Sequence, residues 1–257
     1  KMLRRAVSFT TWFKVPELGM SSFERLSQGS AVVVAMKGNI PPIILASDRT
    51  ARPFALRELF PEEFLDHVKP EHVKHSIETR CAEGNILESF NLDSETFLAH
   101  PSLDVAVVRL CETEEKRFRE HKGVIPVRLS EQLPSAEELT CLVGYDLPDD
   151  NDSDTSEIIQ KLNATEISDC NVVSCDDTRG VILIQAPLPA AMSGGCVVGT
   201  QDSDKDLCYG ILEGNLPLEE DEDVKSPYYV DCATFIPSLE IRRWLNDPLT
   251  YSRDYNS

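Results

Sequence analysis

Short apolar runs separated by turn residues set the strongest limit on how this chain folds. From Gly29 onward the runs are rich in Val, Ile and Leu and only as long as a strand, as in "SAVVVAM", "PPIILAS", "LDVAVVRL" and "GVILIQA". Runs of this kind, bounded by Gly, Pro, Asp and Ser, are typical of an all-β barrel or sandwich. None approaches the roughly 18 apolar residues that a bilayer-spanning helix needs, so we expect no membrane span.

Helical patterning is confined to three stretches of the chain. They are residues 53–77, residues 112–122 ("ETEEKRFREHK") and residues 237–246. In the last stretch Pro237 and Ser238 can open a helix whose apolar residues share one face. We therefore predict a helical insertion at 53–77 and a C-terminal helix at 237–246 in an otherwise all-β protein.

The chain carries a strong negative charge. Its 257 residues include 44 acidic and 25 basic side chains, which gives a formal net charge of −19. Such a surface repels phosphate backbones, so direct nucleic-acid binding is not expected. The eight cysteines are scattered singly through strand-like segments, which favours reduced thiols in an intracellular protein over a disulfide framework.

The first 24 residues form a segment of different character. Residues Lys1–Lys14 are basic, hydroxylated and apolar, and no acidic residue precedes Glu17. This composition resembles a mitochondrial targeting segment, and the alternative is a basic N-terminal arm that docks on an acidic surface. Both interpretations place residues 1–24 outside the β-barrels. If the segment is a targeting signal, the protein is expected in mitochondria; if it is a docking arm, the protein is expected in the cytosol or nucleus.

Two acidic stretches, residues 147–157 and 216–227, are predicted to be solvated loops. Clustered acids and turn-forming residues cannot fill a core. An acidic docking site or a calcium loop is the functional alternative. The first stretch lacks the glycine and the spaced terminal glutamate of an EF-hand, and we expect no metal site.

Three segments together resemble the trypsin-like serine peptidases of the HtrA/Deg branch. "AHPSLDVAVVRL" (99–110) resembles the segment that carries the family's catalytic aspartate, and "PAAMSGGCVVG" (189–199) its nucleophile loop. "VDCATFIPSLEIRRWLND" (230–247) resembles the last strand and C-terminal helix of that branch. The resemblance implies two six-stranded antiparallel β-barrels with a cleft between them, one over residues 25–128 and the other over 129–257.

The resemblance also assigns positions to a catalytic triad, and one of them is changed. Asp104 takes the position of the acid and Ser193 that of the nucleophile, but "IILASDRTARP" places Arg49 where the histidine should be. Arginine stays protonated in proteins and cannot accept the serine proton. Ala191 replaces a glycine whose N–H contributes to the oxyanion hole. We therefore predict an inactive homologue, in which Arg49 forms an ion pair with Asp104.

Two alternatives stay open at this point. In the first, a histidine of the insertion, His67, His72 or His75, acts as an unusual base, and the chain is an active endopeptidase. In the second, the former substrate cleft binds a peptide along the strand that includes Gly210, Ile211 and Leu212. The preferred interpretation is a non-catalytic subunit that needs no cofactor and has protein partners in a larger intracellular assembly.

Overall fold

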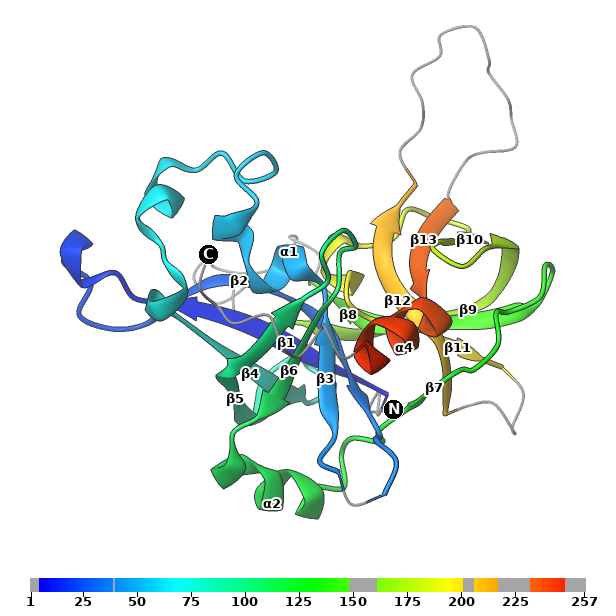
Figure 1. Cartoon of the computed structure of the whole chain (residues 1–257), viewed down its shortest axis with the longest axis horizontal. Helices are drawn as coiled ribbons and strands as arrows, with labels where there is room; N and C mark the ends of the chain where they lie inside the picture. Colours follow the sequence, from blue (N-terminus) through cyan, green and yellow to red (C-terminus); the bar gives the residue numbers. More distant parts are fainter. Residues whose placement is uncertain (1–4, 39, 148–160, 201–205, 217–231, 248–257) are drawn as a thin grey trace, which may run out of the picture.

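Two closed barrels of antiparallel strands form the described part of the chain (Figure 1). The computed structural model describes residues 5–38, 40–147, 161–200, 206–216 and 232–247. In the first barrel the strands follow the order β1-β2-β3-β6-β5-β4, and β4 pairs with β1 to close it. In the second, β11 pairs with both β8 and β12 and closes a ring in the order β11-β8-β9-β10-β13-β12. The predicted all-β double barrel is confirmed.

The strands of the first barrel are β1 (Ala6–Phe13), β2 (Glu24–Val34), β3 (Ile43–Ala46), β4 (Val73–Arg80), β5 (Ile86–Ala99) and β6 (Ala106–Leu110). Those of the second are β8 (Leu139–Asp146), β9 (Asn163–Cys175), β10 (Gly180–Leu183), β11 (Cys196–Gly199), β12 (Leu207–Asn215) and β13 (Cys232–Pro237). A short strand β7 (Arg128–Leu129) links the barrels and runs parallel to β12. The helices are α1 (Asp48–Ala51), α2 (Glu112–Glu120) and α4 (Ser238–Asn246).

Several strands are apolar on both faces because the two barrels pack against each other. In β2, Ala31 and Val33 belong to the core cluster inside the first barrel, whereas Val32 and Val34 belong to a cluster that both barrels share. A third cluster, which includes Leu142, fills the second barrel. The alternation of strand side chains between two buried faces explains why these segments are continuous apolar runs in the sequence.

The predicted N-terminal arm is wrong for most of its length. Residues Ala6–Phe13 form β1, which pairs with β2 and β4, and nearly all of its side chains are buried. In "AVSFTTWF" the apolar Val7 and Phe9 point into the barrel core, and the basic residues that gave the segment its targeting character lie on either side of the strand. The first barrel thus begins at Ala6 rather than at residue 25.

The predicted helical insertion at 53–77 is also corrected. The segment contains only three 3₁₀ turns, η2 (Pro53–Ala55), η3 (Glu63–His67) and η4 (Pro70–His72), before β4 begins at Val73. Its prolines lack an N–H and disfavour helical backbone in the residue that precedes each of them, so a longer helix cannot form. The turns project from the first barrel on the side of α1 (Figure 1).

The C-terminal helix agrees with the prediction. Helix α4 covers Ser238–Asn246 and buries Ile241, Trp244 and Leu245 in the cluster that the barrels share. The expected boundary between residues 25–128 and 129–257 falls within β7. Apart from Leu147 and Leu216, the two acidic stretches lie outside the described residues. Among those described, no helix has both the length and the apolar character that a membrane crossing requires.

Candidate functional site

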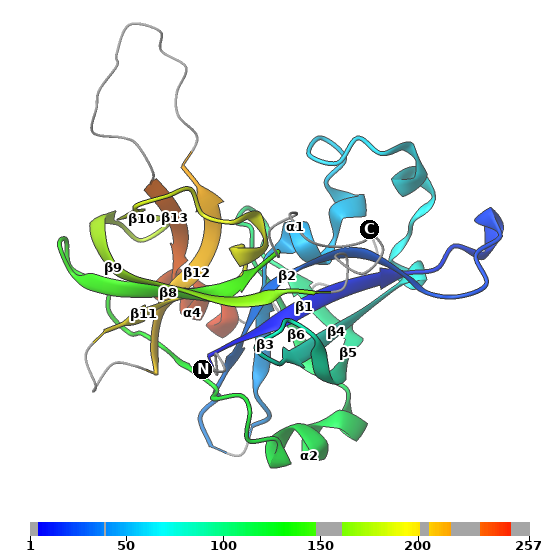
Figure 2. The same ribbon diagram turned by 180° about the vertical axis from the view of Figure 1, so that it is seen from behind.

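A cleft of about 430 Å³ lies between the two barrels. The first barrel contributes residues near the end of β3 and in α1, including Ser47 and Arg49. The second contributes the loop before β11, with Ser193, and the end of β12. In Figure 1 these elements meet between α1 and β12, and Figure 2 shows β1 and β2 beside β8 from the opposite side. Of the residues that the sequence singled out, Arg49, Ala191 and Ser193 line the cleft.

Arg49 and Asp104 form a direct ion pair in this cleft. The Arg49 Nε donates to Asp104 Oδ2 at 2.7 Å, and the Arg49 backbone N–H donates to Oδ1 at 2.9 Å. The Ser47 hydroxyl donates to the same carboxylate, with 2.9 and 3.0 Å to its two oxygens. Arg49 thus takes the hydrogen-bonding position in which a triad histidine would contact the acid, and it has no lone pair with which to accept a proton.

The environment of Asp104 is mostly protein. Its side chain is only 14% exposed, and burial raises the pKa of this carboxyl above its ordinary value. The Arg49 guanidinium and its backbone N–H, together with the Ser47 hydroxyl, offset part of that shift. The carboxylate is therefore fully occupied by donors of the first barrel.

The hydroxyl and the backbone N–H of Ser193 are both engaged within the second barrel. The hydroxyl donates to the Glu213 carbonyl oxygen at 2.8 Å, and the Arg49 Nη2 donates to that same oxygen. The Ser193 N–H donates to the Ala190 carbonyl oxygen at 3.2 Å, as part of the 3₁₀ turn η5 (Ala190–Met192). An oxyanion hole needs this N–H to point at a substrate oxygen, so one of its two donors is already used.

Ser30 of β2 holds the serine loop from the first barrel. Its hydroxyl donates to the Ala191 carbonyl oxygen at 2.7 Å and accepts from the Tyr145 N–H at 2.8 Å. Gly194 has φ of +85°, and a Cβ placed there would lie 2.3 Å from the Ser30 carbonyl oxygen. Because the first barrel approaches so closely, only a glycine can occupy the first glycine position of the Ser-Gly-Gly triplet.

The side wall of the cleft is closed by Asn215. Its side-chain oxygen accepts from the Leu188 N–H at 2.6 Å, and its amide nitrogen donates to the Leu188 carbonyl oxygen at 2.9 Å. This paired bridge joins two segments that line the cleft. Neither Asn215 nor Ser30 was predicted as a site residue, because each acts through a contact with a segment distant in the sequence.

The predicted peptide-pairing residues do not border the cleft. Gly210 and Ile211 pair with β11 on one side and β13 on the other, and Leu212 exchanges backbone hydrogen bonds with Gly194 and Gly195. All three lie inside the sheet and offer no open edge. The part of β12 that lines the cleft is Glu213–Asn215, which directly follows the three residues that we predicted.

The insertion histidines have other contacts. His67 is exposed in η3, and His72 lies 3.8 Å from Glu17. His75 is buried, with its Nε2 3.0 Å from the Ala51 carbonyl oxygen. Among the described residues that line the cleft, none is a histidine. The structure thus brings Arg49, Asp104 and Ser193 together and does not add an insertion histidine to them.

The cysteines and acidic residues form no second site. All eight cysteines are free thiols, and five of them are buried. Within the described ranges, no group of three or more His, Cys, Asp or Glu side chains is placed to hold a metal ion. Burial raises the pKa of the Cys141 thiol to about 12, as expected for an unreactive core cysteine.

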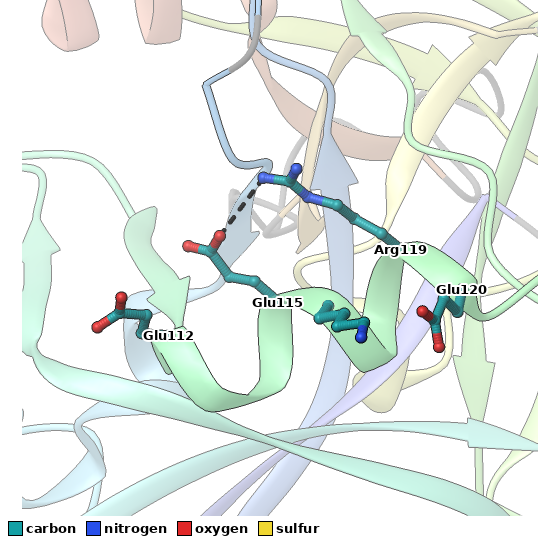
Figure 3. A pocket seen from close by; sticks show the side chains of 5 residues that line it. Glu112, Glu115, Arg119 and Glu120 are labelled. Atoms are coloured by element: carbon teal, nitrogen blue, oxygen red, sulfur yellow. Dashed lines mark hydrogen bonds and ion pairs between the residues drawn. The ribbon is translucent and has the colours of Figure 1, made fainter.

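A second hollow lies along α2, and Figure 3 shows it from close by. Its lining consists only of charged side chains from this one helix, Glu112, Glu115, Lys116, Arg119 and Glu120. Glu115 and Arg119 form an ion pair at 3.4 Å across one helical turn. A single solvated helix face of this kind has no walls that could select a ligand.

Comparison with known proteins gives no match, either to a family model or to a curated sequence. The class is therefore defined by the fold and the site alone. The described chain has two closed six-stranded antiparallel barrels with a cleft between them, which is consistent with a chymotrypsin-like double barrel.

Proposed function

We propose that this chain is a catalytically inactive homologue of trypsin-like serine peptidases and serves as a non-catalytic binding subunit of an intracellular assembly. The observation that carries the proposal is the contact of Arg49 with Asp104 at 2.7 Å. Attack by a serine hydroxyl needs a neighbouring base, and a guanidinium bound to the triad acid cannot act as one. The eight free cysteines support an intracellular setting.

The arrangement of the serine loop supports the same conclusion independently. The Ser193 hydroxyl donates to a carbonyl oxygen rather than to a base, and its N–H is bonded to Ala190. Loss of one oxyanion donor costs about 10²–10³ in rate, and loss of the base costs more. The two changes lie on different barrels, so repair of one leaves the other in place.

The cleft is proposed to bind an extended segment of a partner protein. Its volume of about 430 Å³ and the apolar side chains of Phe60, Leu147 and Leu188 suit a peptide rather than a charged small molecule. Since Asn215 bridges to Leu188, a bound segment would contact a shallow surface and place no side chain in a deep pocket.

A fluorophosphonate probe tests the absence of catalysis. We expect no labelling of Ser193 under conditions in which an active trypsin-like peptidase reacts completely. The Ser193→Ala variant gives the background level. Labelling of the wild-type chain well above that background would contradict the proposal and favour an active peptidase with an unusual base.

A further inference from the structure

We infer that residues 58–64, called here the rim, form the docking edge for a partner segment that combines apolar and basic side chains. The rim has the sequence "ELFPEEF" and belongs to the insertion between η2 and η3. This inference rests on the proposed binding role of the cleft and extends it, because it names the chemistry of the partner.

The rim adjoins the cleft through Phe60. That side chain lines the same hollow as Arg49 and Ser193. Leu59 and Phe64, on either side of it, are 58% and 41% exposed. Three large apolar side chains within seven residues, next to a hollow, are typical of a protein-binding surface.

The rim is held in a fixed conformation. The Arg57 Nη1 donates to the carbonyl oxygens of Phe60 and Glu62, at 2.7 and 2.8 Å. Arg57 Nε also lies 2.8 Å from the Asp66 carboxylate. These bonds tie the middle of the rim, and Asp66 just beyond it, to one guanidinium. The exposed apolar side chains are therefore presented by an ordered turn, which lowers the entropic cost of binding.

The charge around the rim is negative and unbalanced. Glu58, Glu62 and Glu63 are exposed, and none has an ion-pair partner among the described residues. The two arginines that precede the rim in the sequence bind other carboxylates, since Arg57 binds Asp66 and Arg52 binds Asp48 through two hydrogen bonds. An apolar strip flanked by free carboxylates attracts a segment with Lys or Arg between its apolar residues.

The same charge excludes two other kinds of partner. Nucleic acids and anionic membrane surfaces carry negative charge, and the rim would repel both. A partner protein segment is therefore the occupant that the surface fits.

Two labelled peptides test the inference by fluorescence anisotropy. The first is the synthetic octapeptide Leu-Arg-Phe-Lys-Leu-Arg-Phe-Lys, and the second has Glu and Asp in place of Arg and Lys. We expect the wild-type protein to bind the basic peptide saturably, more weakly at higher salt, and not to bind the acidic peptide.

A charge-reversed rim is the decisive variant. Glu58→Lys/Glu62→Lys/Glu63→Lys changes only exposed side chains and should weaken binding of the basic peptide by at least about tenfold, equal to about 1.4 kcal/mol, while allowing the acidic peptide to bind. The matched control Glu112→Lys/Glu120→Lys changes exposed acids on α2 and should leave both affinities unchanged. Equal binding by the wild type and the rim variant would overturn the inference, as would an equal effect of the control.

A further variant distinguishes a wrong inference about the rim from a wrong proposal about binding in the cleft. Ala190 is exposed and lines the cleft, so Ala190→Arg obstructs it without touching the rim. If Ala190→Arg no longer binds the basic peptide and the rim variant still does, the peptide binds in the cleft and the inference about the rim is wrong. If only the rim variant loses peptide binding, the inference about the rim is supported and the proposal of binding in the cleft is contradicted. Absence of any binding by the wild type overturns the inference, and the fluorophosphonate experiment still decides the question of catalysis.

Discussion

Two of the arginine–carboxylate pairs in the first barrel have sharply different surroundings. Arg80 and Glu78 are each 1% exposed and lie 3.5 Å apart. Arg49 and Asp104 lie 2.7 Å apart at the cleft, and 39% of the Arg49 side chain is exposed. One pair is enclosed by the fold, and the other is partly exposed to solvent at the cleft between the barrels.

The buried pair is supported by a network of neutral groups. Glu78 accepts from the hydroxyls of Ser8 and Thr10, each at 2.8 Å, and from that of Ser76 at 2.5 Å. Arg80 donates to the Ser8 hydroxyl at 2.7 Å and to the Gly84 carbonyl oxygen at 2.9 Å. Buried charges persist only when their remaining hydrogen-bonding sites are satisfied in this way.

The difference shows that the two pairs have different roles. The network of Glu78 and Arg80 joins strands β1 and β4 of the barrel and cannot lose a member without leaving a charge in the core. The pair in the cleft can be solvated when it is broken. The ion pair of Arg49 with Asp104 is therefore expected to contribute less to the stability of the fold than that of Arg80 with Glu78.

Breaking the buried pair should have the largest effect on stability. Arg80→Met leaves the Glu78 carboxylate buried without its cation, and we expect a loss of about 3–5 kcal/mol in the free energy of unfolding. Urea denaturation measures this loss. In the control Arg243→Met the side chain is 51% exposed and its ion pair is solvated, so the loss of stability should be much smaller. Equal losses in the two variants would show that the network around Glu78 is not structural.

Breaking the pair in the cleft should have a smaller effect. Asp104→Ala removes the acceptor of the buried Ser47 hydroxyl and of the Arg49 N–H, and we expect a loss of about 1–3 kcal/mol in the same urea experiment. Asp104→Asn keeps one acceptor oxygen, so its loss in the free energy of unfolding should be smaller than that of Asp104→Ala. A loss as large as that of Arg80→Met would contradict the distinction between the two pairs.

The pH dependence of stability should reveal the burial of Glu78. Burial raises the pKa of this carboxyl, and its hydrogen bonds and Arg80 offset only part of the shift. The folded state therefore keeps a proton at a pH where the unfolded chain has released it. The resulting stability is complete below the ordinary glutamate pKa and is lost as the pH rises through the raised value.

Comparison with Glu78→Gln isolates this contribution. As the pH falls from 8 to 5, the wild type should gain stability relative to the variant, by no more than about 1.4 kcal/mol per pH unit for one proton. Urea midpoints at several pH values measure the difference. A wild type that loses stability relative to Glu78→Gln as the pH falls would show that the pKa is lowered rather than raised.

Local patterns in the sequence were sufficient for the fold class and for three positions of the site. The apolar runs predicted the barrels. The three short motifs predicted the contact of Asp104 with Arg49 and the position of Ser193 close to both, in the cleft. Strand β1 was missed because its basic flanks obscured the alternation of Val7 and Phe9, a signal that was present.

Other features could not be predicted, because they depend on contacts between distant segments. Nothing near Glu78 in the sequence indicates that Ser8 and Thr10 of β1 will donate to it. Similarly, the contact of Ser30 with Ala191 arises only when the barrels pack together. The register of β12, which places Glu213 rather than Gly210 at the cleft, also depends on its pairing with β13.

Restoring the base should have the smallest effect. Arg49→His returns a proton acceptor beside Asp104, but the Ser193 N–H still donates to Ala190, and Ser30 still holds the Ala191 carbonyl group. A histidine alone therefore cannot supply oxyanion stabilisation, and we expect fluorophosphonate labelling to stay at the level of Ser193→Ala. If Arg49→His were labelled, and the label were lost on adding Ser193→Ala, the serine loop would be competent. The missing base would then be the whole cause of inactivity, and the changes on the second barrel would have no catalytic consequence.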